Sequence, residues 1–292
     1  MPFSCPNCAS LEKTSSYFVR FGFYFRTSDS KSIQRYLCMG CKTTCSAQSG
    51  SAWFRQKKRL KNKSLRKHFC SAGSIRRAAR SFQLNRKTVE RKLLALGFYA
   101  ESELGRLNRQ KPKAKIIEFD DLETFEHTKC KPLSVTIAVE YKTRRILGLE
   151  VSSMPAKGLL AERARNKYGP RIDGRSEARR ILFSKIKELV AEDALIKSDS
   201  NPHYPEDVKT FFPKAKHVQY EGKRGSLGGQ GELKKVKFDP LFSLNHTCAM
   251  LRANVNRLIR KTWCTTKRAD RLRSHLMIYA HYHNEHLKLK AA

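Results

Sequence analysis

The sequence predicts an α/β domain, a mixed sheet with flanking helices, preceded by a small cysteine-rich module and an all-α module. Three observations support this prediction. Two CxxC pairs lie near the start of the chain, an apolar helical period occurs between residues 75 and 97, and β-type segments alternate with helical ones from residue 115 onward. With 292 residues, 40% of them apolar, the chain has enough material for one sizeable core and one or two small modules.

The net charge restricts the class of partner. The chain has 60 Lys and Arg against 26 Asp and Glu, a formal charge of +34. Such a surface attracts polyanions, because each neutralised phosphate releases condensed counterions. No apolar run approaches the roughly 18 residues that a membrane-spanning helix needs, and no leader pattern precedes the early cysteines. We therefore expect nucleic acid as the partner, no membrane, no small-molecule substrate, and a reducing cytoplasm around the cysteines.

Residues 1–50 are predicted to form a zinc ribbon. Cys5 and Cys8 form one CxxC pair, Cys38 and Cys41 form another, and the residues between them are rich in aromatic side chains. Tetrahedral Zn²⁺ prefers four thiolates, and the short spacing lets two sulfurs from one turn reach the same ion. The alternative is reduced cysteines packed as small hydrophobes. Cys45 lies where a ribbon usually places an apolar core residue, so we leave it outside the predicted site.

Residues 57–100 have the pattern of a helix-turn-helix. After a basic segment, apolar residues recur at the helical period from residue 75 to 82, Asn85 is placed to cap a second helix, and Gly97 is placed to end it. The alternative is an ordinary helical hairpin with solvated charges. In a helix-turn-helix the first turns of the second helix face base edges in the major groove. The predicted DNA-contacting side chains are Arg86, Lys87, Thr88 and Arg91.

A linker is predicted for residues 101–115, which end in RQKPKAK, and one α/β domain for residues 116–292. This domain begins with three closely spaced strands and continues with alternating helices and strands. The order βββαβαβα is that of the RNase H-like fold. The predicted strands are 115–120, 133–141, 145–152, 194–199 and 217–220, and the predicted helices are 176–191, 205–212 and a helical region at 241–289.

Acidic residues lie where this fold would bring them together. Its first strand and the end of its fourth strand are neighbours, so Asp120 and Asp199 could share a metal ion. A late helix would supply a third ligand, for which Asn245 is best placed, with Arg252 two turns later on the same helix face. Two Mg²⁺ or Mn²⁺ ions, which prefer oxygen ligands, stabilise both the entering and the leaving oxygen of phosphodiester attack.

The segments that carry these residues resemble bacterial insertion-sequence transposases of the DDE superfamily. They are EFDDLETF (118–125), IKSDSNPHY (196–204) and LNHTCAMLRANVNRLIRKTWCTTK (244–267), following CPNC, YLCMGC and the helix-turn-helix. The resemblance covers almost the whole chain, and the last segment is its most specific part. It implies a nucleoid-associated bacterial protein that binds double-stranded DNA as a homo-oligomer, cuts at terminal inverted repeats and joins the freed 3′ ends to target DNA.

Carried over by position, Asp120 and Asp199 would be the two catalytic aspartates, and Arg252 the basic residue that follows the third member. That third member is normally Glu, whereas this sequence has Asn245. Some related families use Asn, but a neutral amide should bind Mg²⁺ more weakly. Two alternatives to Asn245 stay open: Asp239 as the third ligand, and an inactive site. Asp121 is in turn an alternative to Asp120.

A Gly- and Lys-rich segment, residues 222–237, lacks the spacing of a phosphate-binding loop, so we predict a connection in which Lys223 and Arg224 contact DNA. Two other functions stay open. One is a domesticated, catalytically inactive transposase acting as a DNA-binding regulator. The other is a structure-specific DNA nuclease, which would share the metal site but respond to DNA shape.

Overall fold

The computed structural model describes Cys5, Asn7 and residues 17–27, 30–46, 48–49, 53–54, 56–221, 239–259 and 264–287. It divides into two compact units, Met1–Lys67 and His68–Ala292. Among the residues described, no helix combines the length and the apolar character needed to cross a bilayer. The predicted connection at residues 222–237, with Lys223 and Arg224, lies outside the described residues, as does Cys8.

The first unit contains a small antiparallel sheet in the order β1-β2-β3, formed by β1 (Phe18–Arg26), β2 (Lys31–Cys38) and β3 (Thr44–Ser46). The pairing of β1 with β2 is interrupted by a bulge between Arg20 and Phe23. Gly22 supplies the positive φ of +63° that this bulge uses, a conformation that costs glycine little. A small antiparallel sheet is thus present where the sequence predicts a zinc ribbon, and Cys38 and Cys41 lie at the turn that follows β2.

Three helices follow: α1 (Lys61–Phe69), α2 (Ile75–Ser81) and α3 (Arg86–Arg109). The predicted cap is confirmed, since Asn85 Oδ1 accepts a 2.9 Å hydrogen bond from the backbone N–H of Lys87 at the start of α3. The predicted helix end at Gly97 is wrong. At Gly97, α3 approaches α9 (Ala269–His286) so closely that a Cβ would lie 2.6 Å from the Cβ of Ser274. The glycine therefore permits helix packing and does not terminate the helix.

Residues 101–109, predicted as part of a linker, form the last turns of α3, and only residues 110–113 separate this helix from the first strand of the next sheet. The end of α3 is held to that sheet by a side chain: Asn108 Nδ2 donates to the carbonyl oxygen of Ile146 at 3.0 Å. Asn284 of α9 accepts from the Ile146 N–H at 2.9 Å. Helix α3 and the sheet are consequently parts of one packed unit.

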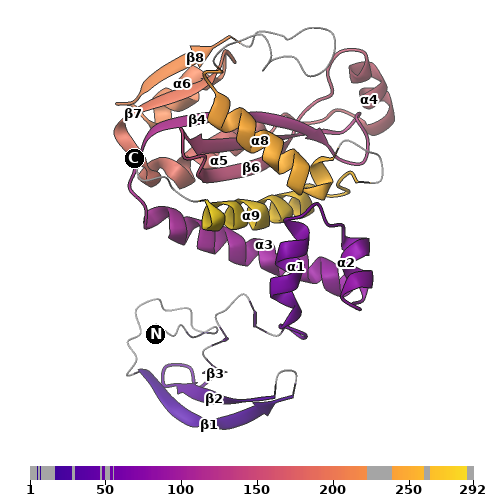
Figure 1. The fold of residues 1–292 in the computed structure, drawn as a ribbon, viewed down its shortest axis with the longest axis vertical. Helices are drawn as coiled ribbons and strands as arrows, with labels where there is room; N and C mark the ends of the chain where they lie inside the picture. The colour runs from indigo at the N-terminus through magenta and orange to yellow at the C-terminus, as the bar shows by residue number, and fades with distance from the viewer. Residues whose placement is uncertain are drawn as a thin grey trace. The chain divides into compact units, whose positions relative to one another are not determined.

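The second unit is built on a five-stranded mixed sheet in the order β6-β5-β4-β7-β8 (Figure 1). Strands β4, β5 and β6 pair antiparallel, whereas β7 is parallel to β4 and β8 is parallel to β7. All five strands that the sequence predicts are present. Their bounds are β4 (Ala114–Phe125), β5 (Pro132–Glu140), β6 (Ile146–Ser153), β7 (Val190–Asp199) and β8 (Lys216–Tyr220).

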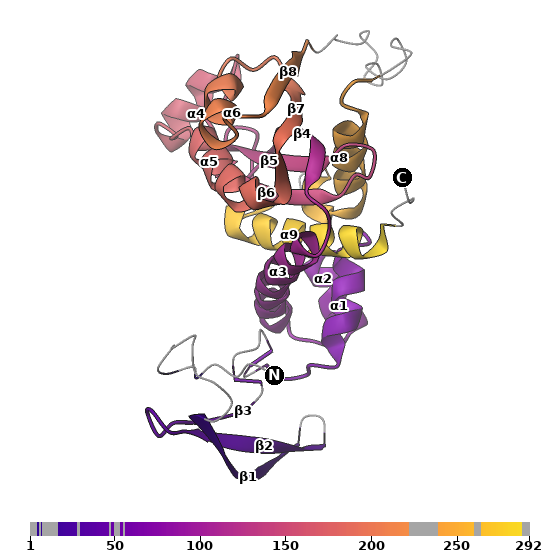
Figure 2. The ribbon, with the colours of Figure 1, turned by 90° about the vertical axis from the view of Figure 1, so that its left-hand side faces the viewer.

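Helices cover both faces of this sheet (Figure 2). One face carries α5 (Arg175–Ile186) and α6 (Tyr204–Phe211), whose apolar side chains pack with Ile117 and Phe119 of β4. The other face carries α8 (Phe242–Asn254). Glu118, which lies between Ile117 and Phe119 in sequence, points to this face and contacts α8. Helix α4 (Leu160–Tyr168) was not predicted. Short 3-10 helices, η2 (Lys187–Leu189) and η3 (Asn256–Leu258), end α5 and follow α8.

Candidate functional site

The two predicted catalytic aspartates lie on neighbouring parallel strands. Glu118 of β4 pairs with Lys197 of β7, so two residues further along each strand Asp120 lies beside Asp199, the last residue of β7. Burial, and next the charge of Asp199, raise the pKa of the Asp120 carboxyl from 3.8 to about 7. Burial also raises the pKa of Asp199. Two carboxylates held this close form a site that favours a proton or a cation.

Tyr204, the first residue of α6, holds the Asp120 carboxylate. Its hydroxyl donates a 3.1 Å hydrogen bond to Asp120 Oδ1, and its side chain is fully buried. The ring is fixed by Phe119, at 4.8 Å between centroids, and by the Arg179 guanidinium, 4.9 Å from its centroid. Sequence reasoning assigned no role to Tyr204. The available signal was an aromatic residue at the start of a helix, shortly after Asp199.

Asp121, the alternative to Asp120, has different surroundings. The Thr136 hydroxyl donates to Asp121 Oδ1, and the Arg179 guanidinium lies 4.0 Å from its Oδ2. Asp121 is close enough for its charge to raise the pKa of Asp199, but its carboxylate is directed toward α5. Since side chains alternate along a strand, Asp120 and Glu118 share the face covered by α8.

Glu118 attaches α8 to the sheet. Its side chain is fully buried, and its Oε2 accepts a 2.8 Å hydrogen bond from the backbone N–H of Leu244 in the first turn of the helix. Such an N–H has no partner within the helix, and a carboxylate at this end is favoured by the helix dipole. Burial dominates, however, and raises the pKa of Glu118 to about 7. Sequence reasoning did not single out this residue.

The two alternatives for a third metal ligand lie against each other. Asn245 Nδ2 donates to Asp239 Oδ2 at 2.9 Å, and Asp239 Oδ1 accepts from the N–H of Leu241 at 2.9 Å. Asn245 is exposed. One turn later, Cys248 is buried, and burial together with the charge of Asp120 raises the pKa of its thiol to about 12. In the described part of the chain, the hydrogen bond of the Asn245 amide is thus to Asp239 and not to Asp120 or Asp199.

The predicted DNA-contacting residues of α3 have the expected exposure. Arg86, Lys87 and Arg91 are exposed and Thr88 is partly exposed, while Val89 faces the core. On α8, Arg252 is also exposed.

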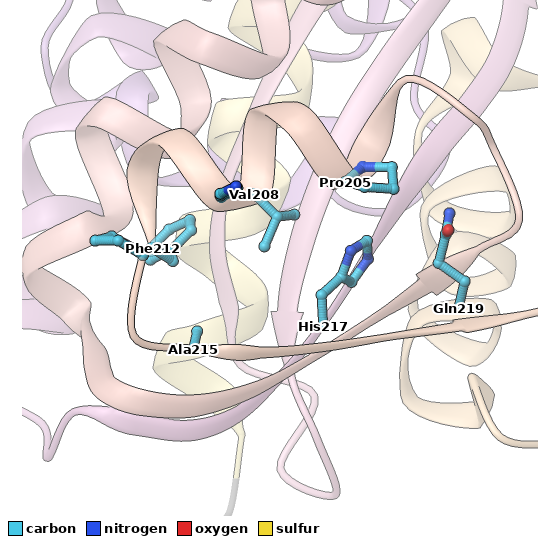
Figure 3. A pocket seen from close by; sticks show the side chains of 8 residues that line it. Pro205, Val208, Phe212, Ala215, His217 and Gln219 are labelled. Atoms are coloured by element: carbon cyan, nitrogen blue, oxygen red, sulfur yellow. The ribbon is translucent and has the colours of Figure 1, made fainter.

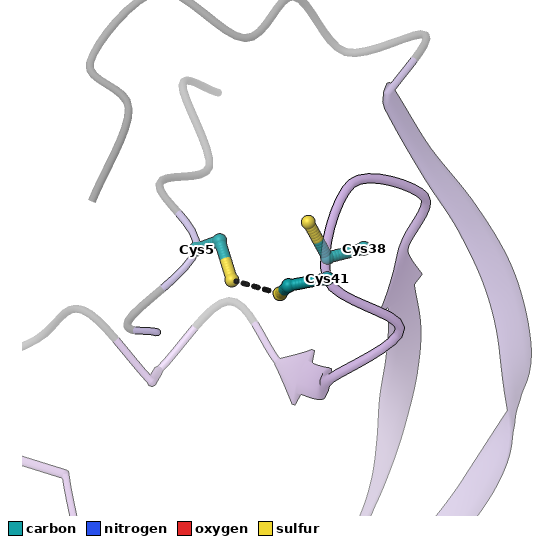
Figure 4. Close-up of side chains that lie close together, drawn as sticks. All are labelled: Cys5, Cys38 and Cys41. Carbon is teal, nitrogen blue, oxygen red and sulfur yellow. Dashed lines mark hydrogen bonds between the residues drawn. The ribbon is translucent and has the colours of Figure 1, made fainter. Parts of the chain in front are cut away.

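The cysteine site belongs to the first unit. The sulfur atoms of Cys5, Cys38 and Cys41 lie within 4.8 Å of one another (Figure 4), and this is the one group of three or more Cys, His, Asp or Glu side chains placed to hold a metal among the described residues. The Cys5 and Cys41 sulfurs are 3.4 Å apart. Three thiols in this arrangement supply three corners of a tetrahedral zinc site. The sequence-predicted fourth ligand, Cys8, lies outside the described residues.

Cys45, which the sequence placed in the core of the ribbon, is indeed buried beside this cluster with Phe18 and Cys38. Its pKa is raised first by burial and then by the charges of Cys5, Cys38 and Cys41. Cys45 is therefore close enough for the charges of the three thiols to affect its pKa, but it does not belong to the group of sulfurs placed to hold a metal.

A hollow of about 350 Å³ lies between α6 and β8 (Figure 3). Its wall combines apolar side chains with Lys209 and His217 and contains no carboxylate, so it is separate from the acid pair. One of its lining residues, Gln219, donates to the carbonyl oxygen of Asp199 at 3.0 Å and thereby supports the strand end that carries the acid. The labelled lining residues are Pro205, Val208, Phe212, Ala215, His217 and Gln219.

Comparison with known proteins adds no family: no protein-family model matches the chain, and no curated protein is significantly similar to it in sequence.

Proposed function

We propose that this chain is a metal-dependent DNA transposase, in which Asp120 and Asp199 hold the catalytic cations. The observation that carries this proposal is the placement of these two carboxylates on adjacent parallel strands, close enough for the charge of Asp199 to raise the pKa of Asp120. Asp120 and Asp199 are partly buried, and two carboxylates held this close are costly unless a cation or a proton neutralises them.

The sheet supports an RNase H-like assignment for the catalytic domain. Its strand order, β6-β5-β4-β7-β8, has three antiparallel strands followed by two parallel ones. The acids belong to its central strand and to the neighbouring parallel strand. This is the juxtaposition expected of that fold from the order of elements in the sequence.

In the proposed reaction, the residues of the chain position groups and do not form bonds to DNA. Mg²⁺ or Mn²⁺, when bound, would stabilise the developing charge on the entering and leaving oxygens of the scissile phosphodiester. Asp120 and Asp199 would hold the cations, and Tyr204 would keep the Asp120 carboxylate in one orientation. Asn245 or Asp239 would complete the ligand set at the start of α8, and Arg252 would contact a phosphate.

DNA recognition is assigned to α3 and to the cysteine module. Exposed cations on the first turns of α3 match the requirements for contacts to bases and phosphates of double-stranded DNA. Because α3 is joined to the sheet through Asn108 and α9, a DNA end bound by its first turns would be held at a fixed distance from the acid pair. Bringing two element ends together would require a homo-oligomer. A zinc ion in the cysteine site would stabilise the first module.

The test uses duplex DNA from the sequences that flank the gene, where paired inverted repeats are expected. Nicking at the repeat end is measured with Mg²⁺ or Mn²⁺ for the wild type and for Asp120→Ala and Asp199→Ala. Both variants should bind the duplex as the wild type does and should not nick it. Asp121→Asn is the matched control, because Asp121 faces Arg179, and it should retain nicking.

The other outcomes identify the rival functions. Tight, end-specific binding without nicking under any divalent ion would indicate a DNA-binding regulator and overturn the enzymatic proposal. Nicking that depends on branches or flaps and is indifferent to the end sequence would indicate a structure-specific nuclease.

A further inference from the structure

One face of the N-terminal sheet is open and apolar. Side chains directly opposite each other in an antiparallel pair lie on the same face, and Phe18 and Cys38 are such a pair on the face that packs around the cysteines. The next residues along the strands therefore point to the other face, which we call the open sheet face. Its apolar members are Val19, Phe21, Tyr24, Ile33 and Leu37.

The rings on this face are accessible. Phe21 is 46% exposed and Tyr24 is 39% exposed, values far above those of aromatic residues in a core. Val19 is 50% exposed, whereas Ile33 and Leu37 are partly buried. An accessible apolar surface of this kind normally marks a site of interaction.

The charge of the strands identifies the class of partner. The open sheet face carries Arg26, Lys31 and Arg35, whereas Arg20 points to the opposite face with Tyr36, and the three strands contain neither Asp nor Glu. The Arg35 guanidinium lies 5.5 Å from the centre of the Phe21 ring, so a cation and an aromatic ring are presented side by side. Repulsion between these cations opposes the pairing of two copies through this face, whereas a polyanion with flat apolar groups is complementary to it.

We propose that the open sheet face binds an unpaired DNA strand, with bases stacked on Phe21 and Tyr24 and phosphates beside Arg35 and the neighbouring cations. The bases of a duplex are stacked on one another and cannot cover an aromatic ring on a flat sheet. Unpaired bases can stack on such a ring, and this stacking does not depend on the base sequence. The proposal is independent of the acid pair, because it concerns a different unit of the chain and requires no cleavage.

The experiment measures fluorescence anisotropy of a labelled oligothymidylate of about 20 nucleotides, long enough to span a typical single-strand site. The full-length Asp120→Ala chain is the background, so that no probe is cleaved. A second probe is an abasic phosphodiester strand of the same length, which keeps the charge and lacks the bases. Phe21→Ala and Tyr24→Ala are compared with Phe25→Ala, which removes a ring that is more exposed, at 64%, from the opposite face of the same hairpin.

Phe21→Ala and Tyr24→Ala should each weaken oligothymidylate binding about 5- to 150-fold, the range that the loss of one stacked base gives. They should leave binding of the abasic strand unchanged. Phe25→Ala should leave both unchanged, and zinc content should be equal in all variants, which shows that the module is folded. Equal loss in Phe25→Ala, or no loss in the other two, would overturn the proposal. A change in sedimentation without a change in DNA binding would instead assign this face to contacts between copies.

Discussion

The hydroxyl of Tyr204 donates a hydrogen bond to Oδ1 of Asp120 across 3.1 Å, from the first residue of α6 to the central strand of the sheet. The bond fixes one oxygen of a carboxylate whose pKa burial and Asp199 raise to about 7. Because the carboxylate is rigid, its second oxygen is then also held in one orientation, as a metal ligand requires.

Tyr204→Phe should remove this hydrogen bond and keep the packing of the ring against Phe119. We expect nicking to slow about tenfold, equivalent to roughly 1.4 kcal/mol, with more Mg²⁺ needed for half-maximal rate. Thermal stability should change little, because the ring stays in place. Tyr220→Phe on β8 is the control, and equal rates for the two variants would remove Tyr204 from the list of positioning residues.

Asn245 and Asp239 are distinguished by charge. Asn245→Glu adds a carboxylate where the resemblance implies the third ligand, so it should lower the Mg²⁺ concentration for half-maximal nicking, whereas Asn245→Ala should raise it. Asp239→Asn keeps a side chain that can still bond to Asn245. If Asp239→Asn abolishes nicking while Asn245→Ala does not, Asp239 is the ligand.

The cysteine site should contain about one zinc per purified chain, measured by elemental analysis. Cys38→Ala should lose the metal and unfold the first module, because the sulfur of Cys38 is one of the three that meet. Cys45→Ala should keep the metal at a cost of about 1 kcal/mol of stability from the lost packing. Loss of zinc in Cys45→Ala would make Cys45 a ligand.

Gly97 and Gly105 offer a paired test of the contact between α3 and α9. A Cβ at Gly97 would lie 2.8 Å from the Cα of Ser274, so Gly97→Ala should force the helices apart and cost about 1–3 kcal/mol. At Gly105 the nearest atom is the end of the Arg109 side chain, at 3.4 Å. Gly105→Ala should therefore stabilise the chain by up to about 1 kcal/mol, since alanine favours a helix. Urea unfolding of both variants measures whether the two changes in the free energy of unfolding have opposite signs.

The same contact should depend on pH through Glu101. Hydrogen bonds from Arg273 are the largest cause that lowers the pKa of Glu101 from 4.5 to about 2. A carboxyl with a lowered pKa in the folded state stabilises the fold above pH 4.5, and this contribution is lost as the pH falls from 4.5 toward 2.

Glu101→Gln should accordingly be less stable than the wild type at pH 7, and the difference should shrink as the pH falls from 4.5 and disappear only below about pH 2. Urea unfolding at a series of pH values measures the difference. Glu103→Gln, which removes an exposed ion pair with Arg106 on the same helix, is the control and should change stability by less than about 1 kcal/mol at either pH. A difference for Glu101→Gln that is as large near pH 2 as at pH 7 would contradict the assignment.

Local patterns in the sequence were sufficient to predict most of the elements, although not α4 or the full length of α3. The five strands of the main sheet, the cap at Asn85 and the cysteine turns all follow from residue types a few positions apart, because strand alternation and helix capping are local effects. The pairing of Asp120 with Asp199 was also predictable, since the order of strands restricts which of them can be neighbours.

Other features depend on contacts between residues distant in the sequence. Gly97 has the sequence signal of a helix end, and only the approach of Ser274, far along the chain, makes it part of a longer helix. Likewise, burial of Glu118 against Leu244 and the bond from Tyr204 to Asp120 arise when helices pack on a sheet already formed. The sequence by itself determined most of the elements and which acids are neighbours. The tertiary structure decided the length of α3 and how those acids are held, because burial and close packing are properties of the assembled chain.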